Sequence, residues 1–115
     1  MLSRACLSIV GLFVLSGSLI SAGQNSTFQI YGEGNASCGL WASARSNADN
    51  RNAAVLGAWL LGFISGAGSS MQPGALRPTN PQAIEGAMDK YCQANPASQV
   101  SDGARVLVRE LAMKQ

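Results

Sequence analysis

The sequence predicts an all-α protein: a compact bundle of about four helices with one disulfide, preceded by a cleaved signal peptide and a short extended lead. Three observations predict this architecture. The chain starts with an export signal, keeps two cysteines after the signal, and has four segments with apolar residues at helical spacing. With 115 residues, 47% of them hydrophobic and 12% charged, it has the length of one domain and is too apolar for a disordered tail.

Residues 1–23 have the three parts of a secretory signal peptide. Arg4 supplies the positive charge, Leu7–Ile20 is an apolar run, and small residues follow it. We expect cleavage after Ala22 or Gly23. The alternative is an uncleaved membrane anchor, but the run is shorter than the roughly 20 apolar residues that a spanning helix needs. We therefore expect no stable membrane insertion once the signal is removed.

Cleavage leaves residues 24–115 as a single helical domain with two cysteines, Cys38 and Cys92. In an exported protein, two cysteines most simply form one structural disulfide. A loop of this length is worth about 4 kcal/mol in the chain-entropy model. The alternative is a reactive thiol, but neither cysteine is in a C-x-x-C motif and the chain has no histidine to activate one. The predicted location is the periplasm.

The domain begins with Thr27–Tyr31, where apolar and polar residues alternate as in a short extended segment. Gly32–Asn35 then interrupts this pattern. A first helix is expected to start near Asn35 to Ser37, because both residues are favourable N-caps. Its expected residues include Cys38, Trp41, Ala42 and Arg45.

A second helix is predicted over roughly 52–65, with one bulky face and one thin face. The bulky face consists of Val55, Leu56, Trp59, Leu60, Phe63 and Ile64. The thin face consists of Ala54, Gly57, Ala58, Gly62 and Ser65, with Leu61 as its one bulky residue. Because glycine inside a helix costs about 1 kcal/mol relative to alanine, we expect the thin face to pack closely against another backbone. Gly62→Leu is then expected to overpack this contact and to cost roughly 1–3 kcal/mol.

A membrane-spanning second helix is the alternative, since no charge occurs between Asn52 and Leu76 and Gly62-x-x-x-Gly66 resembles a membrane helix contact. Its strongly apolar part is Ala53–Ile64, a length that favours a buried core helix.

Two further helices follow a glycine- and proline-rich loop, Gly66–Thr79. Asn80 as N-cap and Pro81 at the first helical position predict the start of the third helix, which stops at Asn95–Pro96. The third helix has an apolar stripe of Ile84, Ala87, Met88, Tyr91 and Cys92. The fourth has Val100, Ala104, Leu107, Val108 and Leu111 on one face and Asp102, Arg105 and Arg109 on the other.

The residue types argue against an enzyme. With no histidine, the chain cannot form a Ser-His-Asp relay or a histidine-ligated metal site. Glu85 and Asp89 share a helix face, and we interpret them as a solvated face beside Lys90 rather than as an acid and base pair. Trp41, Trp59 and Tyr91 are expected in the core. We expect no cofactor and no metal, and a net charge of +2 without basic clusters argues against nucleic-acid binding.

Two groups of residues are candidates for binding a protein partner. Val106 and Met113 lie on the polar side of the fourth helix with Arg109 between them. The loop adds Met71, Leu76 and Arg77 in a segment too rich in glycine and proline for a core. Methionine and arginine are enriched at interfaces, although single exposed apolar residues are also normal on any surface.

Four short motifs together resemble two groups of small periplasmic proteins of Gram-negative bacteria. They are Cys38-x-x-Trp41, Leu61 to Gly66, Asp89 to Pro96, and Ala104 to Leu111. One group is the HdeA/HdeB acid-stress chaperones, and the other is the Tai-type immunity proteins that neutralise secreted peptidoglycan amidases. The chain departs from both, because it has only 6 acidic residues for an acid trigger and lacks the additional cysteines of many Tai-type members.

The resemblance implies a non-enzymatic periplasmic protein that binds a partner protein, of the immunity or inhibitor type. An acid-stress chaperone is the first alternative. A structural component of an export route is the second.

Overall fold

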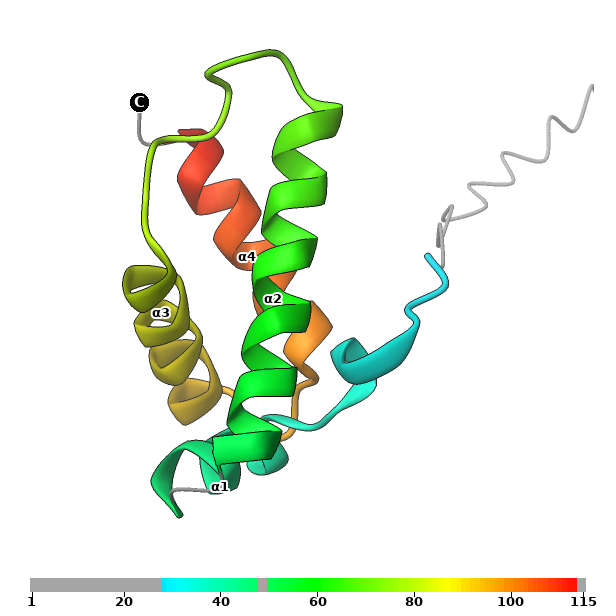
Figure 1. Ribbon diagram of the computed structural model, residues 1–115, viewed down its shortest axis with the longest axis vertical. Helices are drawn as coiled ribbons and strands as arrows, with labels where there is room; N and C mark the ends of the chain where they lie inside the picture. Colours follow the sequence, from blue (N-terminus) through cyan, green and yellow to red (C-terminus); the bar gives the residue numbers. More distant parts are fainter. Residues whose placement is uncertain (1–27, 48–49, 114–115) are drawn as a thin grey trace, which may run out of the picture.

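The computed structural model describes residues 28–47 and 50–113. The predicted signal peptide, its cleavage site and Thr27 lie outside the described residues. The chain forms an all-α bundle, as predicted (Figure 1). Its elements are the 3-10 turn η1 (Gly32–Asn35), α1 (Cys38–Ser46), α2 (Asn50–Ser70), α3 (Pro81–Ala94) and α4 (Val100–Met113).

Helix α1 begins where the sequence predicts. Ser37 is the N-cap, and its hydroxyl accepts a hydrogen bond from the backbone N–H of Leu40 at 3.0 Å. Two backbone hydrogen bonds join this start to the start of α4. Cys38 N–H donates to Ser98 O at 2.8 Å, and Val100 N–H donates to Ala36 O at 2.9 Å. The beginnings of α1 and α4 are therefore held together.

Helix α2 is longer than predicted, because Gly66–Ser70 continues the helix rather than starting the loop. Serine competes for backbone hydrogen bonds, but here the hydroxyls of Ser69 and Ser70 each donate at 2.8 Å to carbonyls one turn back, those of Gly66 and Ala67. The small, flexible residues are thus part of a regular final turn.

The expected close packing at Gly62 is wrong. Gly62 is exposed, and a Cβ built on it meets nothing within 4 Å. The close approach occurs instead at Gly57, which is buried and whose Cβ would meet a carboxylate oxygen of Glu85 at 2.6 Å. Val55, assigned to the core face, is 46% exposed.

The stretch Arg51–Ser70 of α2 has the length and composition of a helix that could cross a membrane, and little of it is buried. Core helices of soluble proteins meet the same two conditions. Leu56, Leu60 and Ile64 of this helix do lie in the core. The disulfide also links Cys38, which precedes α2, to Cys92, which follows it. A membrane-spanning α2 would put these two cysteines on opposite sides of the membrane, so the bond favours a core helix.

Helices α3 and α4 match the predicted boundaries closely. Asn80 caps α3, with its side chain accepting from Ala83 N–H at 2.9 Å, and Pro81 is the first helical residue. The helix ends at Ala94, before Asn95. Of the predicted stripe of α4, Val100, Ala104, Leu107 and Leu111 are buried, and Val108 is partly buried against the core.

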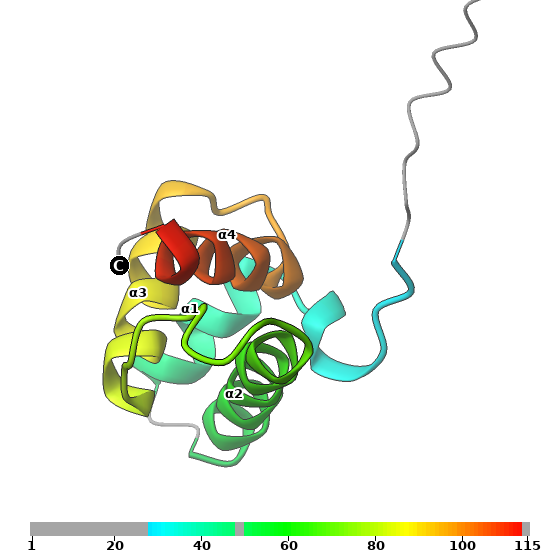
Figure 2. The ribbon, with the colours of Figure 1, turned by 90° about the horizontal axis from the view of Figure 1, so that it is seen from above.

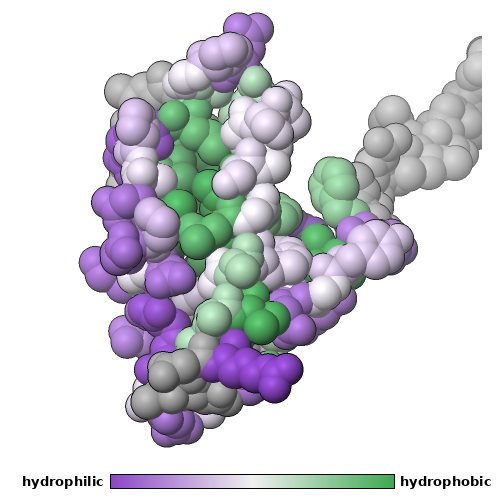
Figure 3. All heavy atoms as spheres, in the orientation of Figure 1, coloured by the Kyte–Doolittle hydropathy of each residue, from purple (hydrophilic) through white to green (hydrophobic). Residues whose placement is uncertain are grey.

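The four helices, which Figure 2 shows from above, surround one apolar core. It consists of Cys38, Trp41, Ala44, Leu56, Leu60, Ile64, Ile84, Met88, Cys92, Val100, Ala104, Leu107 and Leu111. Figure 3 shows that apolar side chains also gather on the surface between α2 and α3, beside a polar edge along α3. The partly buried Leu61 and Leu76 pack against the core as well.

The segment before α1 lies against the second half of α2. Residues 28–31 form no strand, and Gly32 starts the 3-10 turn with a φ of 75°, a conformation that favours glycine. Trp59 Nε1 donates to Tyr31 O at 2.8 Å. Gly34 is buried against the Trp59 ring, where a Cβ would collide with it. Trp59, expected in the core, is therefore half-buried under this segment.

Candidate functional site

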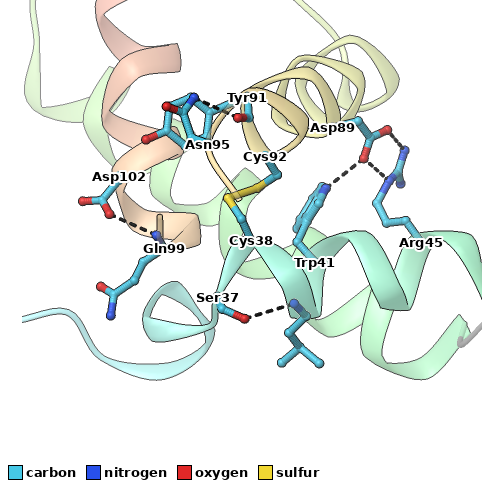
Figure 4. The surroundings of a disulfide bond; sticks show 11 residues. Ser37, Cys38, Trp41, Arg45, Asp89, Tyr91, Cys92, Asn95, Gln99 and Asp102 are labelled. Carbon is cyan, nitrogen blue, oxygen red and sulfur yellow. Dashed lines mark hydrogen bonds and ion pairs between the residues drawn. A yellow bond between two sulfur atoms is a disulfide. The ribbon is translucent and has the colours of Figure 1, made fainter. Parts of the chain in front are cut away.

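The disulfide fixes the alignment of α1 against α3 (Figure 4). Cys38 and Cys92 are bonded, with a Cα–Cα distance of 4.9 Å. The two helices run antiparallel, so residues at equal distances from the two cysteines face each other. Trp41 follows Cys38 by three residues, and Asp89 precedes Cys92 by three. Their side chains meet: Trp41 Nε1 donates to Asp89 Oδ1 at 2.8 Å.

The same alignment brings Arg45 to both carboxylates of α3. Its guanidinium contacts Asp89 through two atoms, with Nε 2.5 Å from Oδ1 and Nη2 2.6 Å from Oδ2. Its Nη1 lies 3.4 Å from Glu85 Oε2. The cation also lies over the Trp41 ring, 5.5 Å from the centroid. Bidentate pairing with a carboxylate is the strongest geometry for an arginine.

This cluster of Trp41, Arg45, Glu85 and Asp89, the carboxylate junction, corrects the sequence interpretation. The two carboxylates are only about one-third exposed, at 28% for Glu85 and 32% for Asp89, and they bind Arg45 rather than forming a freely solvated face beside Lys90. The hydrogen bond to Asp89, opposed by partial burial, raises the pKa of Arg45 above its ordinary value. The guanidinium therefore stays charged at any physiological pH.

The carboxylate junction is suited to holding helices together. Asp89 accepts from Trp41 Nε1 and from two nitrogens of Arg45, so it links the two side chains of α1 to α3. Glu85 lies between Arg45 and the backbone of Gly57 in α2. Within residues 28–47 and 50–113, no three side chains of the metal-binding types come together.

The loop candidates have different positions. Met71 is 36% exposed just after α2. Leu76 is half-buried, packs against the core and lies against Gly68, so its placement outside the core was wrong. Arg77 is exposed, and its backbone N–H donates to Leu111 O at 3.0 Å. The loop therefore passes beside the end of α4.

The candidates on α4 divide as well. Val106 is half-buried and lines a groove between α3 and α4. Arg109 is exposed and does not line this groove, and Met113 is 80% exposed at the end of the helix. The structure thus brings Val106 to a hollow surface and leaves Met113 at the C-terminal end of the bundle.

The α3–α4 groove has a volume of about 690 Å³ and a floor of small residues on α3. It is lined by Ala83, Gly86, Ala87, Lys90, Tyr91, Ala94, Asn95, Val106, Leu107 and Glu110. A Cβ on Gly86 meets nothing within 4 Å, so the floor is open. A smaller hollow of about 90 Å³ at the loop end, lined partly by Arg77, shares Ala83, Ala87, Leu107 and Glu110 with the groove. The two hollows form one elongated surface.

The walls of the α3–α4 groove carry opposite charges. Lys90 projects from α3 and Glu110 from α4, and both are exposed. Neither makes a salt bridge within the part of the chain that the structure describes. The sequence pattern of α4 predicts Val106 as a contact residue but does not predict the groove. A pattern in the sequence of α3 does indicate the groove: small side chains recur along one side of this helix and leave space there. The residues on this side are Ala83, Gly86, Ala87, Lys90 and Ala94.

No family model, curated protein or solved structure matches this chain.

Proposed function

We propose that this chain is a non-enzymatic periplasmic protein that binds a partner protein, of the immunity or inhibitor type, through the α3–α4 groove. The observation that carries this proposal is the groove itself. It is elongated, has an apolar floor, and has one unpaired charge on each wall at Lys90 and Glu110. An apolar helix face with flanking charges is a common occupant of such grooves.

The kind of partner follows from the groove's dimensions and charges. The floor of Ala83, Gly86 and Ala87 admits bulky side chains, while Tyr91 and Val106 supply apolar walls. We expect a helical segment that presents large apolar residues to the floor, with an acidic residue facing Lys90 and a basic residue facing Glu110. The periplasmic location is supported by the disulfide, since an oxidising compartment is where such bonds persist. The resemblance to Tai-type proteins makes a cell-wall amidase the expected partner.

Filling the groove tests this function. Gly86→Leu places a bulky side chain on the open floor without a backbone clash, because a Cβ there meets no atom within 4 Å. The matched control is Gly62→Leu, an equally open helical glycine that does not line the α3–α4 groove. Each protein is used to capture partners from periplasmic extract at neutral pH, and the captured protein is then purified and titrated directly.

We expect the wild-type protein and Gly62→Leu to bind one peptidoglycan hydrolase with equal affinity. Gly86→Leu should lose binding to that hydrolase. Equal binding by both variants would place the interface elsewhere. Capture of proteins without hydrolase activity would remove the immunity assignment.

A second function, an acid-stress chaperone, is favoured by the carboxylate junction. Glu85 and Asp89 connect α1 to α3, and Glu85 also lies against Gly57 of α2. We infer that loss of these two negative charges would release Arg45 from α3. The disulfide would still join α1 to α3, so the opening proposed here is a movement of α2 that exposes the core beneath it.

The two functions separate by pH. A chaperone of this kind suppresses aggregation of acid-unfolded client proteins at about pH 3 and binds a dye for exposed apolar surface there. Asp89→Asn, which removes one of the two charges that bind Arg45 but keeps an acceptor for Trp41, should then expose apolar surface at a higher pH. A protein that stays closed and inactive at pH 3 is not an acid-stress chaperone.

A further inference from the structure

A second hollow lies on the opposite side of the bundle from the α3–α4 groove. It is formed by the segment before η1, by the second half of α2 and by Arg105 of α4, and its volume is about 570 Å³. Its lining consists of Phe28, Gln29, Ile30, Gly62, Phe63, Gly66, Ala67, Ser70 and Arg105. We call it the lead hollow. Its volume is in the range of sites for small organic ligands.

Packed and hydrogen-bonded residues form the walls of the lead hollow. Phe63 stacks on Trp59 with ring centroids 5.3 Å apart, and Trp59 Nε1 fixes the backbone of Tyr31. The floor is open, because a Cβ on Gly62 or Gly66 meets nothing within 4 Å. Glycine destabilises a helix interior relative to alanine, and the core contacts of α2 do not require glycine at these two positions. A space that must stay open above the helix would require it.

One charged residue lines the lead hollow. The guanidinium of Arg105 lies 5.8 Å from the centroid of the Phe28 ring, and it has no salt-bridge partner among the described residues. No acidic residue is part of the lining. A ligand with an apolar body and one anionic head would match this arrangement of charge.

The polar groups of the lining argue against a peptide as the occupant. A peptide backbone loses water when it enters an apolar hollow and then needs hydrogen-bond partners. Ser70 already donates to Ala67 O at 2.8 Å, the backbone of α2 is engaged in its own helix, and Ile30 O accepts from Asn35 Nδ2 at 2.8 Å. Besides Arg105, the lining therefore offers a peptide chiefly the Gln29 amide and the backbone beside it. A hydrocarbon chain requires no such partners.

We propose that the lead hollow binds a single-chain anionic amphiphile, a long-chain fatty acid, with its carboxylate on Arg105 and its hydrocarbon chain along Phe63 above Gly62 and Gly66. This site is independent of the α3–α4 groove and of the partner-binding function. Arginine binds a carboxylate through two parallel hydrogen bonds, and the apolar walls stabilise the chain by excluding water.

Laurate below its micelle concentration is a suitable probe, with dodecanol and dodecyltrimethylammonium as neutral and cationic probes of the same chain length. The purified oxidised protein is titrated by calorimetry and by tryptophan fluorescence, to which Trp59, stacked on the lining residue Phe63, contributes. We expect laurate to bind about tenfold or more tightly than the cationic probe, as one charge-assisted hydrogen bond predicts. Equal affinity for the anionic and cationic probes would overturn the proposal.

Two pairs of variants locate the site. Gly62→Leu should fill the lead hollow and abolish laurate binding, whereas Gly86→Leu, on the open floor of the α3–α4 groove, should leave it unchanged. Arg105→Gln should weaken laurate by about tenfold and leave dodecanol unaffected. The matched control is Arg109→Gln, an exposed arginine one turn further along α4.

Circular dichroism of each variant confirms that the bundle is intact. Unchanged laurate affinity in folded Gly62→Leu would show that the ligand binds elsewhere. Equal losses for Arg105→Gln and Arg109→Gln would show that general positive charge, and not a carboxylate site, attracts the probe.

Discussion

The contact of α1 with α3 and the contact of α2 with the rest of the bundle are made in different ways. Helices α1 and α3 are joined by a covalent bond, by the ion pairs of Arg45 and by the hydrogen bond from Trp41 to Asp89. Helix α2 packs mainly through Leu56, Leu60 and Ile64 and leaves a broad face exposed. Directional bonds fix one alignment of two helices, whereas an apolar core tolerates substitutions that conserve volume. The contact of α1 with α3 thus depends on particular bonds, and the contact of α2 depends on the packing of its apolar side chains.

Among the changes that test these two contacts, breaking the disulfide between α1 and α3 should lower the free energy of unfolding most. Cys38→Ala with Cys92→Ala removes a link across 54 residues and should lower the free energy of unfolding by about 4 kcal/mol. Denaturant titration of oxidised wild type and of the double variant measures the loss. Cys6, in the predicted signal, should not matter. A double variant as stable as the oxidised protein would mean that polar contacts alone hold α1 on α3.

The Asp89 side chain tests the polar part of the same contact. Asp89→Ala leaves the indole N–H of Trp41, a side chain 1% exposed, without its acceptor and should cost about 1–3 kcal/mol. Asp89→Asn keeps an acceptor oxygen and removes only a partly exposed ion pair, so it should cost roughly 1 kcal/mol or less. Equal losses in thermal unfolding would mean that the charge, and not the hydrogen bond to Trp41, stabilises the contact.

The side of α2 that faces η1 can be tested at Gly34. Gly34→Ala drives a Cβ into the Trp59 ring and should cost about 1–3 kcal/mol, with a red shift of tryptophan emission as the ring becomes wet. Gly39→Ala is the control, because its nearest foreign atom, Ser37 Oγ, is 3.6 Å from the built Cβ. An unshifted spectrum with full stability would show that η1 moves freely away from Trp59.

The smallest effect is expected on the exposed face of α2. Gly62→Leu removes a glycine from a helix interior with nothing for the new side chain to strike, so stability should rise by up to about 1 kcal/mol. This replaces the destabilisation expected from the sequence. Chemical denaturation of the oxidised variant, compared with Gly62→Ala, checks the sign. A loss above 1 kcal/mol for leucine alone would mean that this face is covered in solution.

Local signals predicted most of the fold. The start of α3 rests on Asn80 and Pro81, which act on backbone groups within a few residues, so no tertiary knowledge was needed. The buried face of α4 was predicted equally well, because its apolar residues recur at regular helical spacing. The end of α2 was missed because glycine and serine disfavour helices only weakly, and tertiary packing overrides such preferences.

The candidate sites depend on contacts between residues far apart in the chain. Arg45 and Asp89 are separated by 44 residues, so no local pattern joins them. The predicted disulfide gives one point of contact, and the antiparallel packing of α1 and α3 in the structure is what places Trp41 opposite Asp89 and Arg45 opposite Glu85. The thin face of α2 could not be resolved this way, because small residues allow close packing without requiring it. Gly57 and Gly62 are both glycines of the predicted thin face, but Gly57 lies against Glu85 and Gly62 faces open space.

The disulfide also divides the chain into a closed ring and two tails, of which the N-terminal one contains η1. The ring runs from Cys38 to Cys92 and contains all of α1 and α2 and most of α3. Helix α4 follows the ring, and its only covalent link to the ring is the backbone after Cys92. A protease cut inside the ring leaves its pieces covalently linked, whereas one cut between α3 and α4 frees α4 as a separate peptide. Because α4 supplies Val106 to the α3–α4 groove and Arg105 to the lead hollow, that one cut would dismantle both sites.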